Sequence, residues 1–200
     1  KFEPDLKKFS VYRQDPKNAN SLSGNIVRVI HQDVDGILWI GTADGGLNRF
    51  DPKIGEFTRY THDPQNPSSL SDNGINAILQ DHTGTLWIGT AGGLDKFSRQ
   101  KGVIKSYTRA DGLATNIILG IMEDAQGNLW ISSNKGICRF NPVKEAFRYY
   151  HMKDGLQNYE FNAGAYFKNS SSMMYFGGVN GFNVFHPDRM SDNTYIPPVV

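Results

Sequence analysis

Short, mainly hydrophobic runs recur along this chain, and polar, turn-forming residues separate each run from the next. In the first complete unit, apolar runs at residues 26–31, 38–41, 47–50 and 57–61 are divided by DVDG, ADGG and DPKIGE. The apolar and aromatic residues of these short runs favour β-strands, and the Asp, Gly and Pro residues between them predict tight turns. We find no 3.6-residue periodicity sustained over ten residues, so the pattern does not predict a helical solenoid.

The group of four short strands recurs along the chain. The segment GILWIGTADGGLNRFDP returns as GTLWIGTAGGLDKF, GNLWISSNKGICRFNP and, more weakly, SMMYFGGVNGFNVFHP. When Trp39, Trp87, Trp130 and Phe176 are taken as markers, the steps are 48, 43 and 46 residues. Four strands in each repeat of this length predict an all-β fold, a β-propeller of about four blades, each a four-stranded antiparallel sheet.

The repeats divide the chain into blades and two partial segments. The blades cover about residues 16–63, 64–110, 111–153 and 154–188, with a partial blade over 1–15 and a linker or following domain over 189–200. The opening KFEP aligns with RFDP at 49–52, so residue 1 falls inside a third strand. Residues 9–12 could pair with the last blade and close a four-bladed ring. The alternatives are two associated chains or part of a larger ring, because exposed blade edges disfavour an isolated arc.

Residues that recur in every copy are expected to serve the fold. The large flat markers suit a place between facing sheets, where they would act as wedges, and the glycines are assigned to turns. Asp33, Asp81 and Asp124 are expected to cap the turn between the first two strands. Calcium binding at DVDG is a weaker alternative, because no distal glutamate follows at the required spacing. Four repeated asparagines are expected at the mouth of the central channel. Each would either bond the backbone of a neighbouring turn or line a polar ring that faces a ligand. They are Asn25, Asn73, Asn116 and Asn162.

Equivalent positions that differ in chemistry are better candidates for ligand binding. They stand two residues after the tyrosines 12, 60, 107 and 149, or three residues after each of the four asparagines. The loops from fourth to first strands gather at one rim, and loops on a rigid frame concentrate binding residues. The last of these loops, KDGLQNYEFN, adds a ring and a carboxylate. The alternative for Tyr159 is a packed ring, and for Glu160 it is a solvated charge. The candidates are Arg28, His62, Asn76, Arg109, His151, Tyr159 and Glu160.

Composition limits the partners and the chemistry. With 21 Lys and Arg against 20 Asp and Glu, the net charge of +1 gives no electrostatic reason to expect nucleic acid. Cys138, the single cysteine, aligns with Asn48 and Lys96 and is expected to be packed rather than nucleophilic. No catalytic residue, metal or cofactor is predicted. The chain as given has no 18-residue apolar run and no export signal at its start, so we expect no membrane span.

The repeated DVDGILWIGTADGGLNRFDP resembles the two-component-regulator propeller repeat of the periplasmic sensor region of Bacteroides-type hybrid histidine kinases. The chain's ending resembles the last blade of that sensor and the start of its immunoglobulin-like juxtamembrane domain. In that family two seven-bladed propellers precede this domain, a membrane helix and the kinase. The resemblance therefore implies a periplasmic location, an oligosaccharide ligand, and contacts with the remaining propeller and the juxtamembrane domain. The sequence leaves open whether the chain forms a homodimer.

The leading hypothesis is a ligand-sensing module whose binding alters packing against the juxtamembrane domain. These 200 residues contain no recognisable kinase, phosphoacceptor or receiver sequence, so we do not expect an enzyme. A propeller-fold lyase or glycosidase is the first alternative, and it would need paired carboxylates or a placed histidine base. Glu160 is the rim carboxylate that stands out. A protein-docking scaffold is the second alternative.

Overall fold

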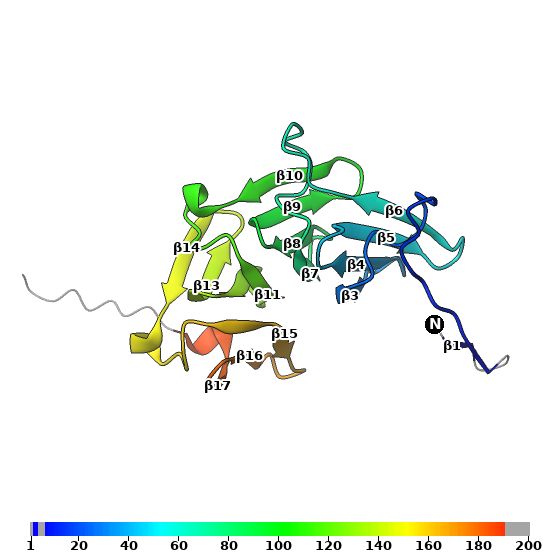
Figure 1. Cartoon of the computed structure of the whole chain (residues 1–200). Coiled ribbons are helices and arrows are strands. Elements are labelled where there is room, and N and C mark those ends of the chain that lie inside the picture. Colours follow the sequence, from blue (N-terminus) through cyan, green and yellow to red (C-terminus); the bar gives the residue numbers. More distant parts are fainter. Residues whose placement is uncertain (1, 4–6, 191–200) are drawn as a thin grey trace, which may run out of the picture.

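The computed structural model describes residues 2–3 and 7–190, and nearly all of its regular structure is β-strand (Figure 1). Four antiparallel sheets, which we call blades 1 to 4, stand beside one another in an arc. Blade 1 contains β3 (Val27–Gln32), β4 (Leu38–Thr42), β5 (Leu47–Asp51) and β6 (Glu56–Tyr60). Blade 2 contains β7 (Ile75–Gln80), β8 (Leu86–Thr90), β9 (Leu94–Ser98) and β10 (Gly102–Tyr107).

Blades 3 and 4 continue the arc. Blade 3 contains β11 (Ile118–Glu123), β12 (Leu129–Ser133), β13 (Gly136–Asn141) and β14 (Ala146–Tyr150). Blade 4 has three strands in the described part of the chain: β15 (Phe161–Lys168), β16 (Met174–Gly178) and β17 (Gly181–Phe185). The remaining elements are the strand pair β1 (Phe2–Glu3) and β2 (Lys8–Phe9) and the short 3-10 helices η1 (Arg109–Asp111), η2 (Met152–Asp154) and η3 (Pro187–Arg189).

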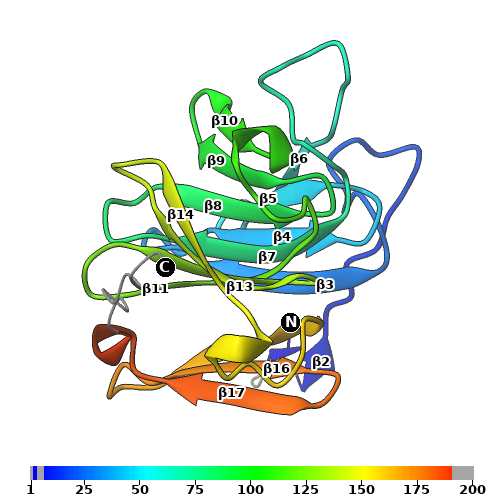
Figure 2. The same ribbon diagram turned by 90° about the vertical axis from the view of Figure 1, so that its left-hand side faces the viewer.

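Within each blade the strands follow chain order from the concave side of the arc outward, as blade 2 illustrates from β7 to β10 (Figure 2). The first strands of successive blades contact one another, which places β3, β7, β11 and β15 along the inside of the arc. This is the arrangement of propeller blades, so the predicted fold is confirmed. In blade 1 each strand lies within one residue, at either end, of the run predicted from the sequence.

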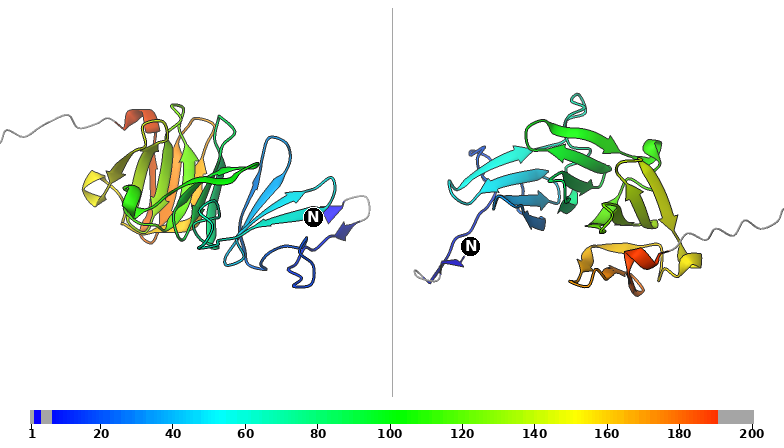
Figure 3. Two further views of the ribbon diagram at one scale, coloured as in Figure 1. Left: turned by 90° about the horizontal axis from the view of Figure 1, so that it is seen from above. Right: turned by 180° about the vertical axis from the view of Figure 1, so that it is seen from behind.

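The arc is open between the N-terminal segment and blade 4 (Figure 3). β2 pairs with β1, and the sheet of blade 4 ends at β17. Closure of a four-bladed ring by residues 9–12 of the same chain is therefore wrong for this structure. The predicted linker or following domain over 189–200 lies almost wholly outside the described residues.

The three tryptophans are fully buried between blades. The ring of Trp39 lies 5.5 Å from that of Phe97 in blade 2, and Trp87 lies 5.8 Å from Phe140 in blade 3. Trp130 lies 4.7 Å from Phe185 in blade 4. Each wedge therefore joins its own blade to the next one along the chain.

Strand register corrects the fourth marker. Leu129 pairs with Phe140 and Met174 pairs with Phe185, so Tyr175 rather than Phe176 occupies the position of Trp130. Side chains alternate across a strand, and a shift of one residue moves a side chain to the opposite face. Phe176 accordingly packs toward blade 3 in a cluster with Trp130. Phe176 is therefore part of the surface against which the Trp130 wedge packs, and it is not itself a wedge.

Two glycines of the second strands serve close packing, although the sequence had assigned the glycines to turns. A Cβ on Gly41 would lie 2.5 Å from Ile75 Cγ2 in blade 2, and one on Gly89 would lie 2.6 Å from Ile118 Cγ2 in blade 3. Such distances are shorter than van der Waals contact allows. A hydrogen at these positions therefore lets the first strand of the next blade approach.

Candidate functional site

Three of the four repeated asparagines hold the loops that connect one blade to the next. Asn25 Oδ1 accepts a hydrogen bond from Gln14 N at 2.9 Å. Asn73 does the same for His62 N at 2.8 Å, and Asn116 for Arg109 N at 2.8 Å. Asn73 and Asn116 are thus bonded to the backbones of His62 and Arg109, which the sequence had singled out as ligand candidates.

From the fourth strand of blade 3 onward, the structure is shifted by one residue relative to the sequence alignment. Tyr150, not Tyr149, pairs with Ile137 as Tyr107 pairs with Leu94. Counting from the paired tyrosines, Tyr159 takes the place of Asn116, and His151 takes the place of Thr108. His151 N donates to Asp154 Oδ2 at 2.8 Å, as Thr108 N donates to Asp111 Oδ2 at 2.9 Å. Asn162 lies instead in the irregular part of β15, between the paired residues Phe161 and Tyr166.

A polar line crosses the inner strands of blades 1, 2 and 3. Arg28 and Asn76 each stand at the bulge of a first strand. Arg28 Nη1 donates to Asn76 Oδ1 at 2.6 Å, and Asn76 Nδ2 donates to the Ile118 carbonyl at 2.9 Å. Asn76 is buried, whereas Arg28 is exposed on the concave side. The line therefore presents a guanidinium, with further N–H donors, to the inside of the arc.

A second pair lies on the loop before blade 4. The rings of His151 and Tyr159 are 6.4 Å apart at 56°. Tyr159 is 44% exposed, and Glu160 beside it is also exposed. This loop therefore offers solvent an aromatic face and a neighbouring carboxylate.

The other two candidates belong to local structure. His62 Nδ1 donates to the Leu70 carbonyl at 2.6 Å within the same loop, because a carbonyl oxygen can only accept. Arg109 opens η1 with an exposed side chain. Within the described part of the chain, neither side chain has a hydrogen bond, ion pair or ring contact to another candidate. The structure thus joins four candidates in two pairs, Arg28 with Asn76 and His151 with Tyr159.

Sequence reasoning missed a polar column that ties the rim loops to the third strands and is buried in blades 1 to 3 but half-buried in blade 4. By register its members are Asn48, Asp95, Cys138 and Asn183, so Cys138 aligns with Asp95 rather than with Lys96. Asn48 Oδ1 accepts from Ser23 N, Asp95 Oδ2 from Ser71 N, and Asn183 Oδ1 from Gln157 N, each at 2.9 Å. Burial raises the pKa of Asp95, and hydrogen bonds from Ser106 and Ser71 oppose that shift. An amide or a carboxylate stands at this position in three of the four copies, so the sequence did contain a signal. The equivalence of these residues becomes visible only when the strands are aligned by their register.

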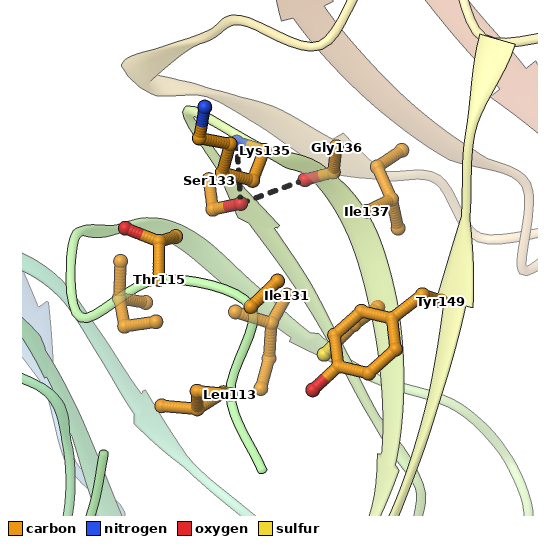
Figure 4. A pocket seen from close by; sticks show the side chains of 11 residues that line it. Leu113, Thr115, Ile131, Ser133, Lys135, Gly136, Ile137 and Tyr149 are labelled. Carbon is orange, nitrogen blue, oxygen red and sulfur yellow. Dashed lines mark hydrogen bonds between the residues drawn. The ribbon is translucent and has the colours of Figure 1, made fainter. Parts of the chain in front are cut away.

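Blade 3 breaks this column at Cys138, which lines a small cavity beneath the rim (Figure 4). The cavity holds about 10 Å³, roughly one water, and Ile131, Ser133 and Tyr149 also line it. The Tyr149 hydroxyl donates to the Gly112 carbonyl and so fastens the loop instead. Burial raises the pKa of the Cys138 thiol to about 12. The thiol therefore stays protonated at neutral pH.

No group of three His, Cys, Asp or Glu side chains within the described residues is placed to hold a metal ion. In the same part of the chain, no helix has the length and apolar character needed to cross a membrane.

Three segments match the family model described as two component regulator propeller: residues 21–44, 69–92 and 112–135. Each runs from the end of a rim loop through the first and second strands of blades 1, 2 and 3. These parts of blades 1, 2 and 3 are similar to two-component regulator propeller repeats. Each match includes the aspartate turn and the tryptophan described above. No match was found among curated proteins.

Solved structures share the fold of these propeller repeats. The extracellular domain of BT4673 from B. thetaiotaomicron, described as a one-component or a hybrid two-component system, aligns with 96% of this chain at 24% identity and a TM-score of 0.77. The extracellular domain of the hybrid two-component system BT3049 from the same organism aligns with 100% at 23% identity and a TM-score of 0.61. This chain spans 27% and 32% of their lengths.

An enzyme has the same fold. Virginiamycin B lyase from Staphylococcus aureus aligns with 80% of this chain and 55% of its own length, at 17% identity and a TM-score of 0.56. At such identities these likenesses show architecture and not a shared activity.

Proposed function

We propose that this propeller is an extracytoplasmic ligand-sensing module of a hybrid two-component sensor kinase and that its ligand is an oligosaccharide. The observation that carries the proposal is the match of three blades to the two-component regulator propeller. The fold shared with extracellular domains of BT4673 and BT3049 supports the same role. A periplasmic location belongs to this proposal.

The His151 and Tyr159 pair is the part of the rim best suited to a sugar. A partly exposed tyrosine ring can cover the C–H face of a pyranose, and a carboxylate such as Glu160 accepts hydrogen bonds from hydroxyls. Arg28 on the concave side supplies donors for hydroxyls or for an acidic sugar. We assign the main ligand contact to the Tyr159 loop, because the side chains of Tyr159 and Glu160 are both exposed to solvent.

The Tyr159 loop is also placed to pass a signal between blades. The Tyr159 carbonyl accepts from Gly136 N of blade 3 at 2.8 Å, and the Glu160 carbonyl accepts from Val179 N of blade 4 at 3.3 Å. A ligand that prefers one arrangement of this loop shifts the packing of blade 4 by its difference in affinity. That shift would reach the juxtamembrane domain through the end of the propeller.

The proposal is tested by thermal-shift measurements and calorimetry with a panel of neutral and acidic oligosaccharides. We expect at least one of them to raise the melting temperature, and Tyr159→Ala and Glu160→Gln to weaken its binding. Val34→Ala is the matched control, because Val34 is exposed in a turn at the opposite ends of the strands. Binding that survives both rim variants would contradict the assigned loop. Failure of every saccharide to bind would contradict the sensing proposal.

The enzyme alternative is tested in the same incubations. Because a lyase shares the fold, each saccharide is analysed by mass spectrometry after incubation with the protein. Shortened or unsaturated products would contradict a sensor. Binding without turnover supports one.

A further inference from the structure

The turn between the second and third strands is closed by a side-chain hydroxyl in blades 1, 2 and 3. Thr90 Oγ1 of blade 2 donates to the Gly93 carbonyl at 3.0 Å and accepts from Gly93 N at 2.9 Å. Thr42 and Ser133 donate to the corresponding carbonyls of blades 1 and 3, at 2.9 and 3.0 Å. The last residue of the second strand therefore caps this turn in each of the three blades.

Blade 4 has a glycine at the capping position. By strand register Gly178 takes the place of Ser133, so the turn between β16 and β17 lacks this hydroxyl. A Cβ on Gly178 would lie 2.4 Å from the Glu160 carbonyl oxygen and 2.0 Å from Gln157 Nε2. The glycine therefore leaves space for the rim loop to approach the turn, and the cap must come from another residue.

The side chain of Gln157 fills this space and supplies the cap. Gln157 Oε1 accepts from Asn180 N, in the turn between β16 and β17, at 2.8 Å. Gln157 Nε2 donates to the Glu160 carbonyl at 3.2 Å, and the same carbonyl accepts from Val179 N at 3.3 Å. One side chain thus joins the turn of blade 4 to the loop that carries Tyr159 and Glu160.

The two bonds of Gln157 require a side-chain amide. The Asn180 N–H can only donate and the Glu160 carbonyl can only accept, so the group between them needs one acceptor and one donor. A carboxylate offers only acceptors, and an ammonium offers only donors. The two bonds of opposite polarity therefore also determine which way the Gln157 amide is turned.

The backbone of Gln157 is anchored as in another blade, whereas its side chain acts differently. Gln157 N donates to Asn183 Oδ1 of β17, as Ser71 N donates to Asp95 Oδ2 in blade 2, each at 2.9 Å. The Ser71 hydroxyl lies 2.7 Å from Thr90 Oγ1, so in blade 2 the rim loop meets the capping hydroxyl. In blade 4 one longer side chain replaces both hydroxyls and also reaches a carbonyl of the rim loop.

We propose that Gln157 is the positioning residue of the Tyr159 loop, and that its amide makes this loop and the β16–β17 turn move as one unit. The inference rests on the proposed function, because it assigns a role to the side chain behind the loop where we place the ligand. A clamp on the Glu160 carbonyl restrains the backbone from which the Glu160 carboxylate projects. The loop is held on its other side by blade 3, since the Tyr159 carbonyl accepts from Gly136 N at 2.8 Å.

The test measures hydrogen exchange of backbone amides by NMR in the full chain, without any saccharide. Gln157→Ala removes both bonds, so the amides of Val179 and Asn180 should exchange about tenfold faster than in the unaltered protein. Gln157→Glu keeps an acceptor for Asn180 N but loses the donor, so Val179 should exchange faster while Asn180 stays protected. The nuclear Overhauser contact between the rings of His151 and Tyr159 should weaken in both variants.

Two further variants separate positioning from a general loss of stability. Gly178→Ala keeps Gln157 but places a methyl against its amide and the Glu160 carbonyl, so Val179 should again exchange faster. Gln126→Ala is the matched control. Gln126 also joins blade 3 to the segment after blade 4 by one side-chain bond, but at the opposite ends of the strands. Its loss should leave the exchange of Val179 unchanged.

Two results would overturn the proposal. Unchanged exchange of Val179 in either Gln157 variant would mean that the loop is held without the amide, and Gln157 would only cap the turn. Equal acceleration of every amide of blade 4 would mean that Gln157 contributes only to stability. Because the measurement uses no saccharide, either result leaves the sensing proposal standing. Conversely, failure of every saccharide to bind would contradict sensing and leave the clamp intact.

Discussion

Trp39 Nε1 donates a 2.7 Å hydrogen bond to Asp33 Oδ2, so one aspartate holds both a turn and a wedge. Its other oxygen, Oδ1, accepts from the backbone amides of residues 35 and 37 at 2.9 and 3.1 Å. The same bond joins Trp87 to Asp81 at 2.8 Å and Trp130 to Asp124 at 2.9 Å. The sequence assigned the aspartate to the turn alone. The structure makes it the link between the blade's hairpin and its contact with the next blade.

Asp124→Ala should lower the free energy of unfolding by about 2–4 kcal/mol. The change leaves a buried indole N–H, two turn amides and the side-chain amide of Asn128 without their acceptor. The matched variant is Asn169→Ala in blade 4. Asn169 Oδ1 accepts from the amides of residues 171 and 173, but no indole is present there, so we expect a loss of about 1 kcal/mol. Urea denaturation measures both. Equal losses would mean that the indole bond contributes nothing to stability.

Gly89→Ala should destabilise the contact between blades 2 and 3 by about 1–3 kcal/mol, because the added methyl overlaps Ile118. In an Ile118→Ala background the overlapping Cγ2 is absent, and the same change should cost much less. A double-mutant cycle from denaturation curves gives this coupling. Additive losses would show that Gly89 acts through backbone freedom instead of through close approach.

The strands and repeats were predictable because short apolar runs and Asp-Gly turns are local signals. Exact register from the fourth strand of blade 3 onward was not predictable. Phe176 and Tyr149 were each chosen one residue away from the structurally equivalent Tyr175 and Tyr150. A strand has a period of two, so each error exchanged the faces of the sheet. The bonds of Arg28 to Asn76 and of Trp39 to Asp33 depend on how blades and turns fold together, which no repeat spacing encodes.

Cys138 should not react with a thiol reagent in the folded protein and should react at once in denaturant. Its side chain is buried, and burial raises its pKa to about 12, so almost no thiolate forms at neutral pH. Absorbance after adding an aromatic disulfide reagent, with and without guanidinium, measures this difference. Rapid labelling in native buffer would mean that the cavity beneath the rim opens to solvent.

Asp95 gives the fold a pH dependence opposite to that of an exposed ion-paired carboxylate. Burial raises its folded-state pKa above the unfolded value of about 3.8, so its protonated form is favoured by folding. The contribution of Asp95 to stability is then complete below the unfolded pKa and is lost as pH rises through the folded pKa. Asn48 and Asn183 hold the equivalent positions, which indicates that an amide fits there.

Asp95→Asn should therefore be at least as stable as the unaltered protein at neutral pH, and its advantage should shrink as the solution is acidified toward the ordinary carboxyl pKa. Asp95→Ala is the matched control. It removes the acceptor for Ser71 N and Ser106 Oγ and should cost about 2–4 kcal/mol at neutral pH. Denaturation curves collected from acid to neutral pH test both. If the difference between the Asn variant and the unaltered protein stayed constant across that range, Asp95 would not titrate with folding, and hydrogen bonding alone would account for its role.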